Sequence, residues 1–396
     1  MGLKMNRKVL SLFVLLAITA TAQCGNVYDI TKYGAKSNND ANQALGQAWK
    51  AACASKVPSK VVVPKGTFRL SRAAFFGPCK APIEFMIVGT LQAPQNPGGF
   101  KDGDGWVTFQ DIDRLTLDGG GTFDGNGQNV WGKHCTRLNY CSKLPINLRF
   151  NFIKNSVIKS VTSLNSKQFH IMVLGGVNLS FRNLKIIAPE DSYNTDGIHI
   201  GRSTNISITD SYIQTGDDCI SVGDGTKNLT VKGVTCGPGH GISIGSLGKY
   251  RNEAPVQGIT VRDCTFKNTQ NGVRIKTWPN ANEGSASDLR FENLYMQNVG
   301  SPVLIDQEYC PWNQCNTQNP SKVKLSKISF KNIWGTSSTP LAVNLICSRG
   351  YPCQNVEVGN IDLKYKGKDG PAHSVCKNVN VKVTGKMNPS PCKFKA

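Results

Sequence analysis

The sequence predicts an all-β protein: one elongated, single-stranded, right-handed parallel β-helix with a short N-terminal capping helix. Three observations predict this fold: a strand-like phrase that recurs nine times, steps between its copies that match one solenoid coil, and one helical segment that precedes them. Repeats of this kind are typical of solenoids, whose coils bury a continuous core only by stacking on one another.

The recurring phrase alternates polar and apolar residues, which is the period of a β-strand with one buried face. It first occurs as DRLTLDG at residue 113 and returns as NSVIKSV, VNLSFRN, TNISITD, KNLTVKG, QGITVRD, SDLRFEN, SKISFKN and QNVEVGN. Its apolar anchors run from Leu115 through Val157 to Val356, and the steps between successive anchors are 42, 22, 27, 23, 30, 30, 39 and 28. The shorter steps match the circumference of one coil, and the longer steps carry loops. A β-sandwich would show closely spaced turns and a βαβ fold would show helical patterns between strands, and neither is visible.

The segment from residue 40 to 56 has a helical pattern instead. Its apolar residues recur at helical spacing behind a candidate N-cap at Asp40 (Ala44, Leu45, Ala48, Trp49, Ala52, Cys53). We expect this helix to cover the open end of the core, where unpaired strand edges invite aggregation. Cys53 is predicted to bridge to Cys79 across this cap.

The N-terminal segment 1–22 has the features of a secretion signal. Three basic residues precede the apolar run 9–18, and small residues follow it up to a predicted cleavage site after Ala22 (Lys4, Arg7 and Lys8 are the basic residues). A membrane span is the alternative, but the run is short and no second long apolar segment follows. We therefore expect residues 1–22 to be a signal peptide and residues 23–396 to form a single secreted β-helix domain.

The cysteines also indicate an oxidising compartment. All 14 lie beyond the predicted signal, and an even number in an exported chain indicates disulfides. Short loops favour four pairs, which are Cys135 with Cys141, Cys310 with Cys315, Cys347 with Cys353, and Cys376 with Cys392. A metal site is the alternative, but the chain contains no Cys-x-x-Cys pair.

Charge and glycosylation signals describe the expected surface. The formal net charge is +20, a field that attracts polyanions or serves solubility alone. Nucleic acid is one candidate polyanion, but export and dispersed lysines without a basic helix favour an acidic polysaccharide. Three Asn-x-Ser/Thr triplets, at Asn178, Asn205 and Asn228, are predicted glycosylation sites.

A second phrase repeats within the coils and contains ionisable residues. Its four copies are DGIHIG at residue 196, DCISVG at 218, HGISIG at 240 and NGVRIK at 271. Asp196, Asp218 and His240 are evenly spaced, and each interval equals one short coil. Since residues one coil apart lie about 4.8 Å from each other in a parallel stack, we expect these three side chains to form a ladder on one outer face.

Asp217 precedes Asp218 and follows Gly216, so we expect both carboxyls at a bend that faces one cleft. With Asp196, three carboxyls would then crowd together. Like charges this close do not all ionise easily, so one carboxyl is expected to keep its proton and serve as a general acid while the others stay anionic. The alternative is that these aspartates only cap backbone groups at turns.

The fourth copy of the phrase contains two cations. Arg274 and Lys276 are two residues apart on one predicted strand and therefore point to the same side. Beside the carboxyls, such a pair suits a sugar that has its own carboxylate, which Arg can bind with two hydrogen bonds. A merely solvated face is the alternative.

At these residues the sequence resembles glycoside hydrolase family 28, the polygalacturonases. The four signatures of that family are present as Asn194-Thr195-Asp196, Gly216-Asp217-Asp218, Gly239-His240-Gly241 and Arg274-Ile275-Lys276. The likeness extends over about residues 26 to 394 and is greatest to the plant branch, particularly the pollen exopolygalacturonases. It implies the pectin-lyase-like form of the solenoid.

The resemblance also implies roles. Asp217 would donate the proton to the leaving oxygen, and Asp196 and Asp218 would activate the attacking water. His240 would tune the acid and contact substrate, while the remaining signature residues would bind the galacturonate unit (Arg274, Lys276 and Asn194). Cys219 would bridge to Cys236 beside the catalytic coil.

The resemblance implies hydrolysis of α-1,4-galacturonosyl linkages in pectin, with inversion, in the cell wall. We expect no cofactor or metal, and a monomer is the default expectation. In inverting enzymes the two carboxyls lie roughly 6.5 to 9.5 Å apart, against about 5 to 5.5 Å in retaining ones. We expect Asp217 to stand opposite Asp196 and Asp218. Exo action is favoured over endo action, and the insertions at 126–150 and 306–322 are the loops expected to decide it. A calcium-dependent pectate lyase and a non-catalytic pectin-binding wall protein are the rival hypotheses.

Overall fold

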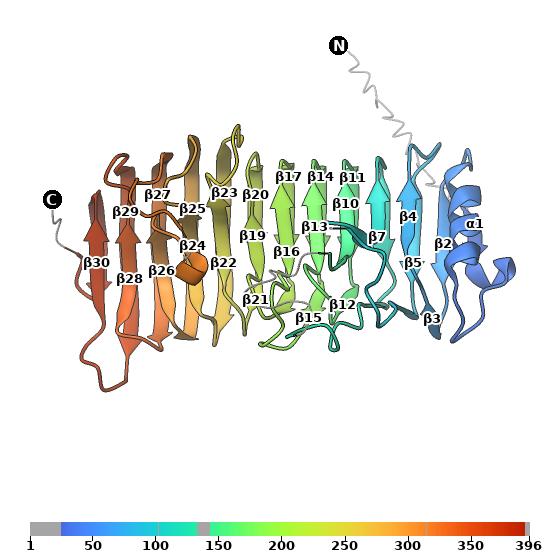
Figure 1. Cartoon of the computed structure of the whole chain (residues 1–396), viewed down its shortest axis with the longest axis horizontal. Coiled ribbons are helices and arrows are strands. Elements are labelled where there is room, and N and C mark those ends of the chain that lie inside the picture. The colour runs from blue at the N-terminus through green and yellow to red at the C-terminus, as the bar shows by residue number, and fades with distance from the viewer. Residues whose placement is uncertain (1–24, 102, 133–142, 314, 393–396) are drawn as a thin grey trace, which may run out of the picture.

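The structure is a computed structural model that describes residues 25–101, 103–132, 143–313 and 315–392. In it the chain winds into a right-handed parallel β-helix, with coils stacked in order from the N-terminal to the C-terminal end (Figure 1). This confirms the predicted fold class. Within the described ranges, no helix has the length and apolar character needed to cross a membrane.

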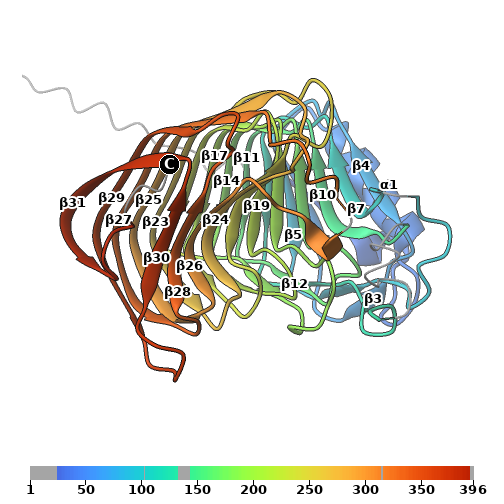
Figure 2. The same ribbon diagram turned by 60° about the vertical axis from the view of Figure 1, so that its left-hand side comes forward.

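One wall of the solenoid is an eleven-stranded parallel sheet, which we call the site sheet. Turning the molecule shows its strands stacked one behind another (Figure 2). Its strands are β4 (Ala73–Phe76), β7 (Gly105–Gln110), β10 (Ile146–Asn151), β13 (Ile171–Leu174), β16 (Ile198–Gly201), β19 (Ile220–Val222), β22 (Ile242–Leu247), β24 (Asn271–Thr277), β26 (Ser301–Asp306), β28 (Leu341–Ile346) and β30 (His373–Lys377).

The other walls belong to a twenty-stranded sheet. Its first wall contains β1 (Asn26–Asp29), β2 (Ser59–Val63), β5 (Ile83–Ile87), β8 (Leu115–Asp118), β11 (Lys154–Lys159), β14 (Val177–Arg182), β17 (Thr204–Thr209) and β20 (Lys227–Lys232). Its second contains β3 (Thr67–Arg69), β6 (Thr90–Gln92), β9 (Thr122–Asp124), β12 (Thr162–Leu164), β15 (Lys185–Ile187), β18 (Tyr212–Gln214) and β21 (Thr235–Cys236). Later coils run through both walls as single long strands, which are β23 (Val256–Lys267), β25 (Gly284–Val299), β27 (Val323–Ser337), β29 (Cys353–Tyr365) and β31 (Val379–Asn388).

The nine copies of the strand-like phrase all fall on the first wall, one in each of nine successive coils from β8 to β29. Most predicted anchors pair in register, as Leu179 does with Ile206 and Ile206 with Leu229. The anchor Val157 is wrong by one residue, because Ser156 is the residue that pairs with Leu179 and faces the core. The Ser156 hydroxyl accepts a hydrogen bond from the Leu115 amide at 3.0 Å, which satisfies this polar group inside the core.

The core is a continuous apolar column, because each coil contributes side chains to the same inward rows. Aromatic rings stack between neighbouring coils, with ring centroids 5.4 Å apart for Phe109 and Phe150 and 5.0 Å apart for Phe291 and Phe330. These contacts place side chains at the close spacing that offset aromatic pairs prefer. The stack fixes the coil register on which the site depends.

The predicted capping helix is α1, Asn42–Cys53, inside the expected range 40–56. It packs on the first coils, where the Trp49 and Phe75 ring centroids are 4.9 Å apart. The carboxylate of Asp40 accepts a hydrogen bond from the Asn42 amide at 2.7 Å, although the N-cap position itself is Ala41. Two short 3-10 helices, Ile30–Tyr33 (η1) and Pro311–Asn313 (η2), complete the helical elements of the described residues.

Five disulfides join cysteines within the described ranges: Cys53–Cys79, Cys219–Cys236, Cys310–Cys315, Cys347–Cys353 and Cys376–Cys392. All five are among the predicted pairs. The predicted pair Cys135–Cys141 lies outside the described residues, as does the signal peptide at residues 1–22. Cys264 is a buried free thiol, so the even cysteine count does not translate into complete pairing.

Candidate active site

The four copies of the second phrase occupy consecutive strands of the site sheet. Ile198 of β16 pairs with Ile220 of β19, which pairs with Ile242 of β22, which pairs with Val273 of β24. Asp196, Asp218 and His240 each precede these residues by two positions, so they follow one another along the stack. The predicted ladder is therefore present.

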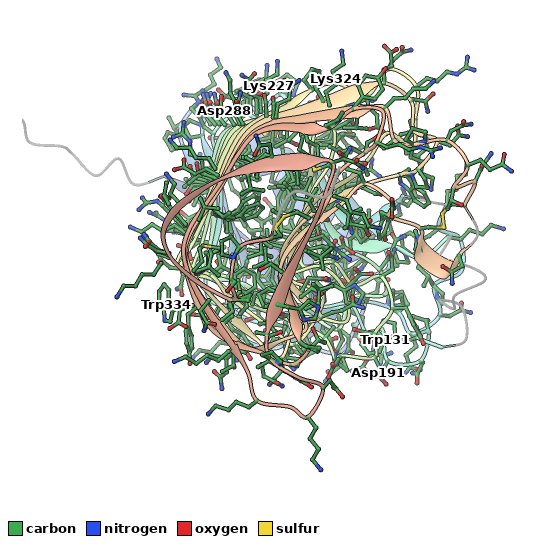
Figure 3. The ribbon with its side chains drawn as sticks, turned by 90° about the vertical axis from the view of Figure 1, so that its left-hand side faces the viewer. Trp131, Asp191, Lys227, Asp288, Lys324 and Trp334 are labelled. Atoms are coloured by element: carbon green, nitrogen blue, oxygen red, sulfur yellow. A yellow bond between two sulfur atoms is a disulfide. The ribbon has the colours of Figure 1, made fainter. Side chains whose placement is uncertain are left out.

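A cleft of about 570 Å³ opens over this ladder. Every residue that the sequence singled out for catalysis or substrate binding lines it, which are Asn194, Asp196, Asp217, Asp218, His240, Arg274 and Lys276. A view along the stack shows Asp191, which also lines the cleft, on the side of the solenoid away from Trp334 (Figure 3). A second hollow adjoins the first and shares Glu190, Gly216, His240 and Gln270 with it.

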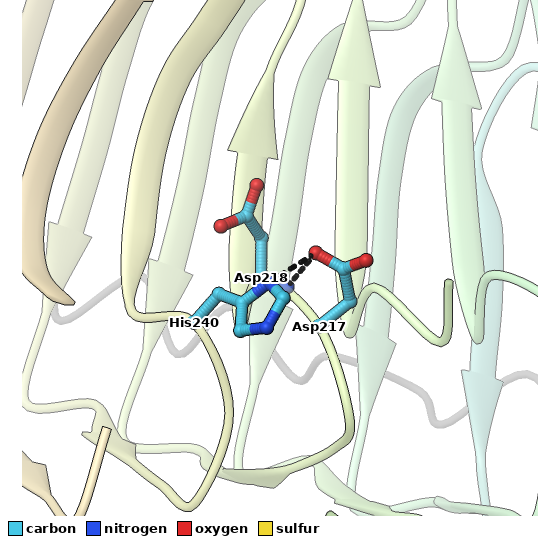
Figure 4. Close-up of side chains that lie close together, drawn as sticks. All are labelled: Asp217, Asp218 and His240. Atoms are coloured by element: carbon cyan, nitrogen blue, oxygen red, sulfur yellow. Dashed lines mark hydrogen bonds and ion pairs between the residues drawn. The ribbon is translucent and has the colours of Figure 1, made fainter. Parts of the chain in front are cut away.

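Asp217 and His240 form a hydrogen-bonded pair at the mouth of the site (Figure 4). His240 Nδ1 lies 2.9 Å from Asp217 Oδ1, which also accepts a hydrogen bond from the Asp218 amide at 2.8 Å. The side chains of His240 and Asp217 are 36% and 23% exposed, so both are open to the cleft. Burial lowers the pKa of His240, but the hydrogen bond and charge of Asp217 raise it more, and the net pKa is above the ordinary value.

Asp218 lies deeper and is bound by two cations. Its Oδ1 accepts hydrogen bonds from Arg274 at 2.9 Å and Ser243 at 2.8 Å, and its Oδ2 accepts one from Lys276 at 2.7 Å. Burial raises the pKa of this carboxyl, but Lys276 and Arg274 lower it more, so the net pKa is far below its usual range. Asp218 is consequently a fixed anion. The two cations bind this aspartate in the structure.

The pKa of Asp196 is shifted in the opposite direction to that of Asp218. It accepts a hydrogen bond from Ser221 at 2.6 Å, and it is 6% exposed. Burial, followed by the charges of Asp217 and Asp218, raises its pKa well above the ordinary value. The crowding of three carboxyls expected from the sequence thus acts most strongly on the pKa of Asp196.

The prediction that Asp217 stands opposite the other two carboxyls is wrong for Asp218. An oxygen of Asp217 and an oxygen of Asp218 lie within 4.8 Å of each other, together with a ring nitrogen of His240. Such a group resembles part of a cation site. However, both oxygens of Asp218 already bind cationic side chains, whereas Ca²⁺ takes six to eight oxygen ligands. The arrangement therefore suits proton chemistry better than calcium binding.

Sequence reasoning missed several residues of the site. His199, Ser221 and Ser243 occupy the fourth position of the repeated phrase, in the column that ends with Arg274, so the alignment of the copies contained their signal. Tyr309 lies over both cations, with its ring centroid 5.7 Å from the Arg274 guanidinium carbon and 5.2 Å from Lys276 Nζ. It comes from the insertion 306–322, and no repeat marks it.

A β-helix whose outer cleft gathers three carboxyls beside a histidine and two cations defines a glycoside hydrolase, since such enzymes work with paired carboxyls. The sequence profile described as Glycosyl hydrolases family 28 matches residues 53–385. The chain belongs to this family.

Individual relatives agree with this assignment. The chain is 52% identical to a polygalacturonase of Gossypium hirsutum, with 96% of this chain and 95% of that protein covered. It is equally identical, at 52%, to an exopolygalacturonase of Platanus acerifolia, with 92% and 97% covered. Among solved structures, the endo-xylogalacturonan hydrolase of Aspergillus tubingensis superposes with a TM-score of 0.79 at 25% identity, covering 91% of this chain and 98% of that one.

Proposed function

We propose that this protein is a secreted, inverting polygalacturonase that hydrolyses α-1,4-galacturonosyl linkages of demethylated pectin from chain ends, as a monomer in the cell wall. The observation that carries the proposal is the single cleft in which Asp196, Asp217, Asp218 and His240 meet two cations. Carboxyls supply acid and base, and cations select an anionic sugar. The relatives at about half identity have names that agree with this substrate.

Arg274 and Lys276 are the proposed binding residues for the substrate carboxylate. The guanidinium of Arg274 has five N–H donors, of which Nε donates to Ser243 and one terminal nitrogen to Asp218. Arg274, Lys276 and Asn194 all line the cleft. An incoming galacturonate carboxylate would therefore share these cations with Asp218, and a methyl ester would not.

Asp217 is the proposed proton donor, and Asp196 with Asp218 the proposed pair that activates water. Asp217 is more exposed than Asp218, at 23% against 1% of the side chain, so it reaches the leaving oxygen more easily. The charges of Asp217 and Asp218 both raise the pKa of Asp196. Three acidic groups in one cleft therefore favour a state in which one proton is retained among them.

Product analysis tests the reaction. Purified enzyme acting on polygalacturonate should first release the anomer of inverted configuration in proton NMR spectra, and single galacturonate units should dominate the early products. Release of the retained anomer would contradict the inverting mechanism, and mixed early oligomers would establish endo action instead. Calcium-dependent unsaturated products would establish the lyase, and intact polymer bound without cleavage would establish the wall-binding alternative.

Substrate charge provides the matched control. Lys276→Met should raise KM for polygalacturonate, while activity on fully methyl-esterified pectin, which lacks the carboxylate, should be low in both wild type and variant. Equal wild-type activity on the two substrates would remove the proposed role of the cations. Tyr309 and Pro311, from the insertion 306–322, also line the cleft and are the residues through which this loop would act on exo or endo mode.

A further inference from the structure

The fourth position of the repeated phrase forms a second polar row beside the acidic ladder. It contains His199, Ser221, Ser243 and Arg274, which pair in register across β16, β19, β22 and β24. Ser221 and Ser243 are 3% and 0% exposed. Because buried hydroxyls are almost always hydrogen-bonded within the protein, the partners of these two serines are informative.

Each serine holds the aspartate of the preceding coil. Ser221 Oγ donates to Asp196 Oδ2 at 2.6 Å, and Ser243 Oγ donates to Asp218 Oδ1 at 2.8 Å. The two pairs are equivalent by the repeat, since the separation along the chain is the same in both. The repeat therefore supplies both carboxyls with the same kind of neutral donor.

A nitrogen donor directs each serine proton onto its aspartate. A hydroxyl has only one hydrogen to donate, so a serine that donates to a carboxylate accepts from its other partner. At Ser243 that partner is Nε of Arg274, 3.0 Å away. At Ser221 it is Nδ1 of His199, 2.8 Å away. His199 must then hold its hydrogen on Nδ1.

The surroundings of His199 suit a neutral, fixed ring. Burial, reinforced by the charge of Lys276, lowers its pKa to about 4. The ring stacks on Phe169 with centroids 5.2 Å apart. The neutral ring therefore has a single N–H and a fixed orientation. By contrast, Arg274 at the equivalent place on Ser243 is itself a cation and also bonds Asp218 directly.

We propose that Ser221 and His199 are positioning residues that turn Asp196 into the base for the attacking water. The imidazole directs the serine proton onto Asp196 Oδ2, which leaves the second carboxyl oxygen to accept a proton from water. As the water oxygen bonds to the anomeric carbon, Asp196 takes that proton, the glycosidic C–O bond breaks, and Asp217 protonates the leaving oxygen. Asp218 has no need of such a ring, because Arg274 and Lys276 hold it. This inference rests on the proposed function.

Substitutions along the hydrogen bonds from His199 through Ser221 to Asp196, which we call the relay, test the proposal. Ser221→Ala and His199→Leu should each lower kcat about tenfold to a hundredfold with little change in KM, the effect of losing one hydrogen bond to a charged group. His199→Asn, whose amide N–H can replace the Nδ1 hydrogen, should restore most of the rate. The double variant Ser221→Ala/His199→Leu should be no slower than either single variant, because both remove the same relay.

Two serines serve as controls. Ser243→Ala should lower kcat less than Ser221→Ala, because Asp218 keeps its two cations. Ser329→Ala, on β27 in the other sheet and outside any Asn-x-Ser/Thr triplet, should behave as wild type. Circular dichroism and thermal unfolding establish that each variant is folded, and Ser221→Cys, which keeps the volume and weakens the hydrogen bond, repeats the test if Ser221→Ala does not fold.

Asp196→Asn separates the two levels of the argument. If Asp196→Asn stays active, the base assignment in the proposed function fails. If Asp196→Asn is inactive, three results would overturn the relay while the proposed function stands. The first is a wild-type kcat for Ser221→Ala, and the second is a double variant in which the two losses of kcat multiply. The third is a His199→Asn variant that is as slow as His199→Leu.

Discussion

Two rows of polar side chains cross the same coils, and they differ in how their hydrogen bonds and charges are satisfied. On the first wall, Asn178 donates to Asn155, Asn205 to Asn178 and Asn228 to Asn205 at 3.0 to 3.1 Å. Each amide side chain is both donor and acceptor, so this row satisfies itself. At the site sheet, by contrast, Asp196 and Asp218 are acceptors when ionised and repel each other.

The comparison teaches where to look for chemistry on a solenoid. A row of neutral amides closes its own hydrogen bonds and stabilises the turn, whereas a row of like charges needs cations, serines and a histidine brought in from other columns. Residues with perturbed pKa values gather at such places. The two aspartates of the acidic row also differ in their partners, since Asp218 is held by two cations and Asp196 by a hydroxyl.

The largest expected effect is at the proton donor. Asp217→Asn should lower kcat roughly a thousandfold or more, because the amide cannot protonate the leaving oxygen. Binding of galacturonan oligomers and the unfolding temperature should change little, since the Asp217 side chain is partly exposed. Steady-state kinetics and calorimetric titration measure both. An unchanged rate would contradict the assignment of Asp217 as the proton donor.

The two other aspartates should affect stability in opposite directions. Asp218→Asn leaves Arg274 and Lys276 buried without their anion and should destabilise the fold by about 3 to 5 kcal/mol at neutral pH. Asp196→Asn removes a buried, repelled charge and should raise Tm at neutral pH.

The pH dependence gives the check on that pair. The depressed pKa of Asp218 contributes stability above its unfolded value of about 3.9, and this stability is lost as the pH falls through the folded pKa. The raised pKa of Asp196 has the opposite sign, since its ionisation disfavours the folded state as the pH rises. Calorimetry should therefore show the Asp196→Asn difference disappearing as the pH falls below about 4. The Asp218→Asn difference should only begin to shrink there and should be lost at lower pH, through the folded pKa of Asp218. Shifts of the same sign at neutral pH would contradict the contrast.

His240 should set the alkaline side of the activity profile. Its pKa is raised, so the imidazolium paired with Asp217 is fully present below the unfolded value of about 6.5 and is lost as the pH rises through the folded pKa. We expect kcat/KM to fall there, and His240→Gln to be slower but to lack that alkaline limb. A limb that persists in His240→Gln would assign it to another group.

The asparagine ladder should give a smaller effect, confined to stability. Asn205 has φ of 57°, a left-handed conformation that asparagine tolerates better than alanine. Asn205→Ala should lower the free energy of unfolding by about 1 to 2 kcal/mol without changing kcat. Asn205→Gly is the matched control, because it also removes the ladder hydrogen bonds and the Asn-x-Ser triplet but keeps the backbone relaxed. Equal losses in the two variants would leave only the hydrogen bonds as the cause.

Glycan occupancy should be the smallest effect to detect. Asn178, Asn205 and Asn228 are consecutive members of the ladder, about 4.8 Å apart, and the side-chain nitrogen of each already donates to its neighbour. We therefore expect fewer than three glycans on protein expressed in a plant host. Intact mass before and after glycosidase treatment counts them, and three attached glycans would show that the rows tolerate more crowding than this.

The sequence by itself determined the coil and the positions along it. Alternation predicted the strands, the equal steps placed Asp196, Asp218 and His240 on successive coils, and helical spacing predicted α1. These features are local or repeat at a fixed interval, and a parallel stack converts such an interval directly into distance. The error at Val157 shows the limit, since a polar Ser156 in the core breaks the alternation that the pattern follows.

Only the tertiary structure decided the partners and protonation of the site. That Lys276 and Arg274 bind Asp218 while Asp196 receives only a serine depends on side-chain reach between columns, which no spacing along the chain contains. Burial then acts on each carboxyl together with its own partners, so two aspartates with the same repeat position have pKa values shifted in opposite directions. Tyr309 likewise reaches the cations from an insertion outside the repeat.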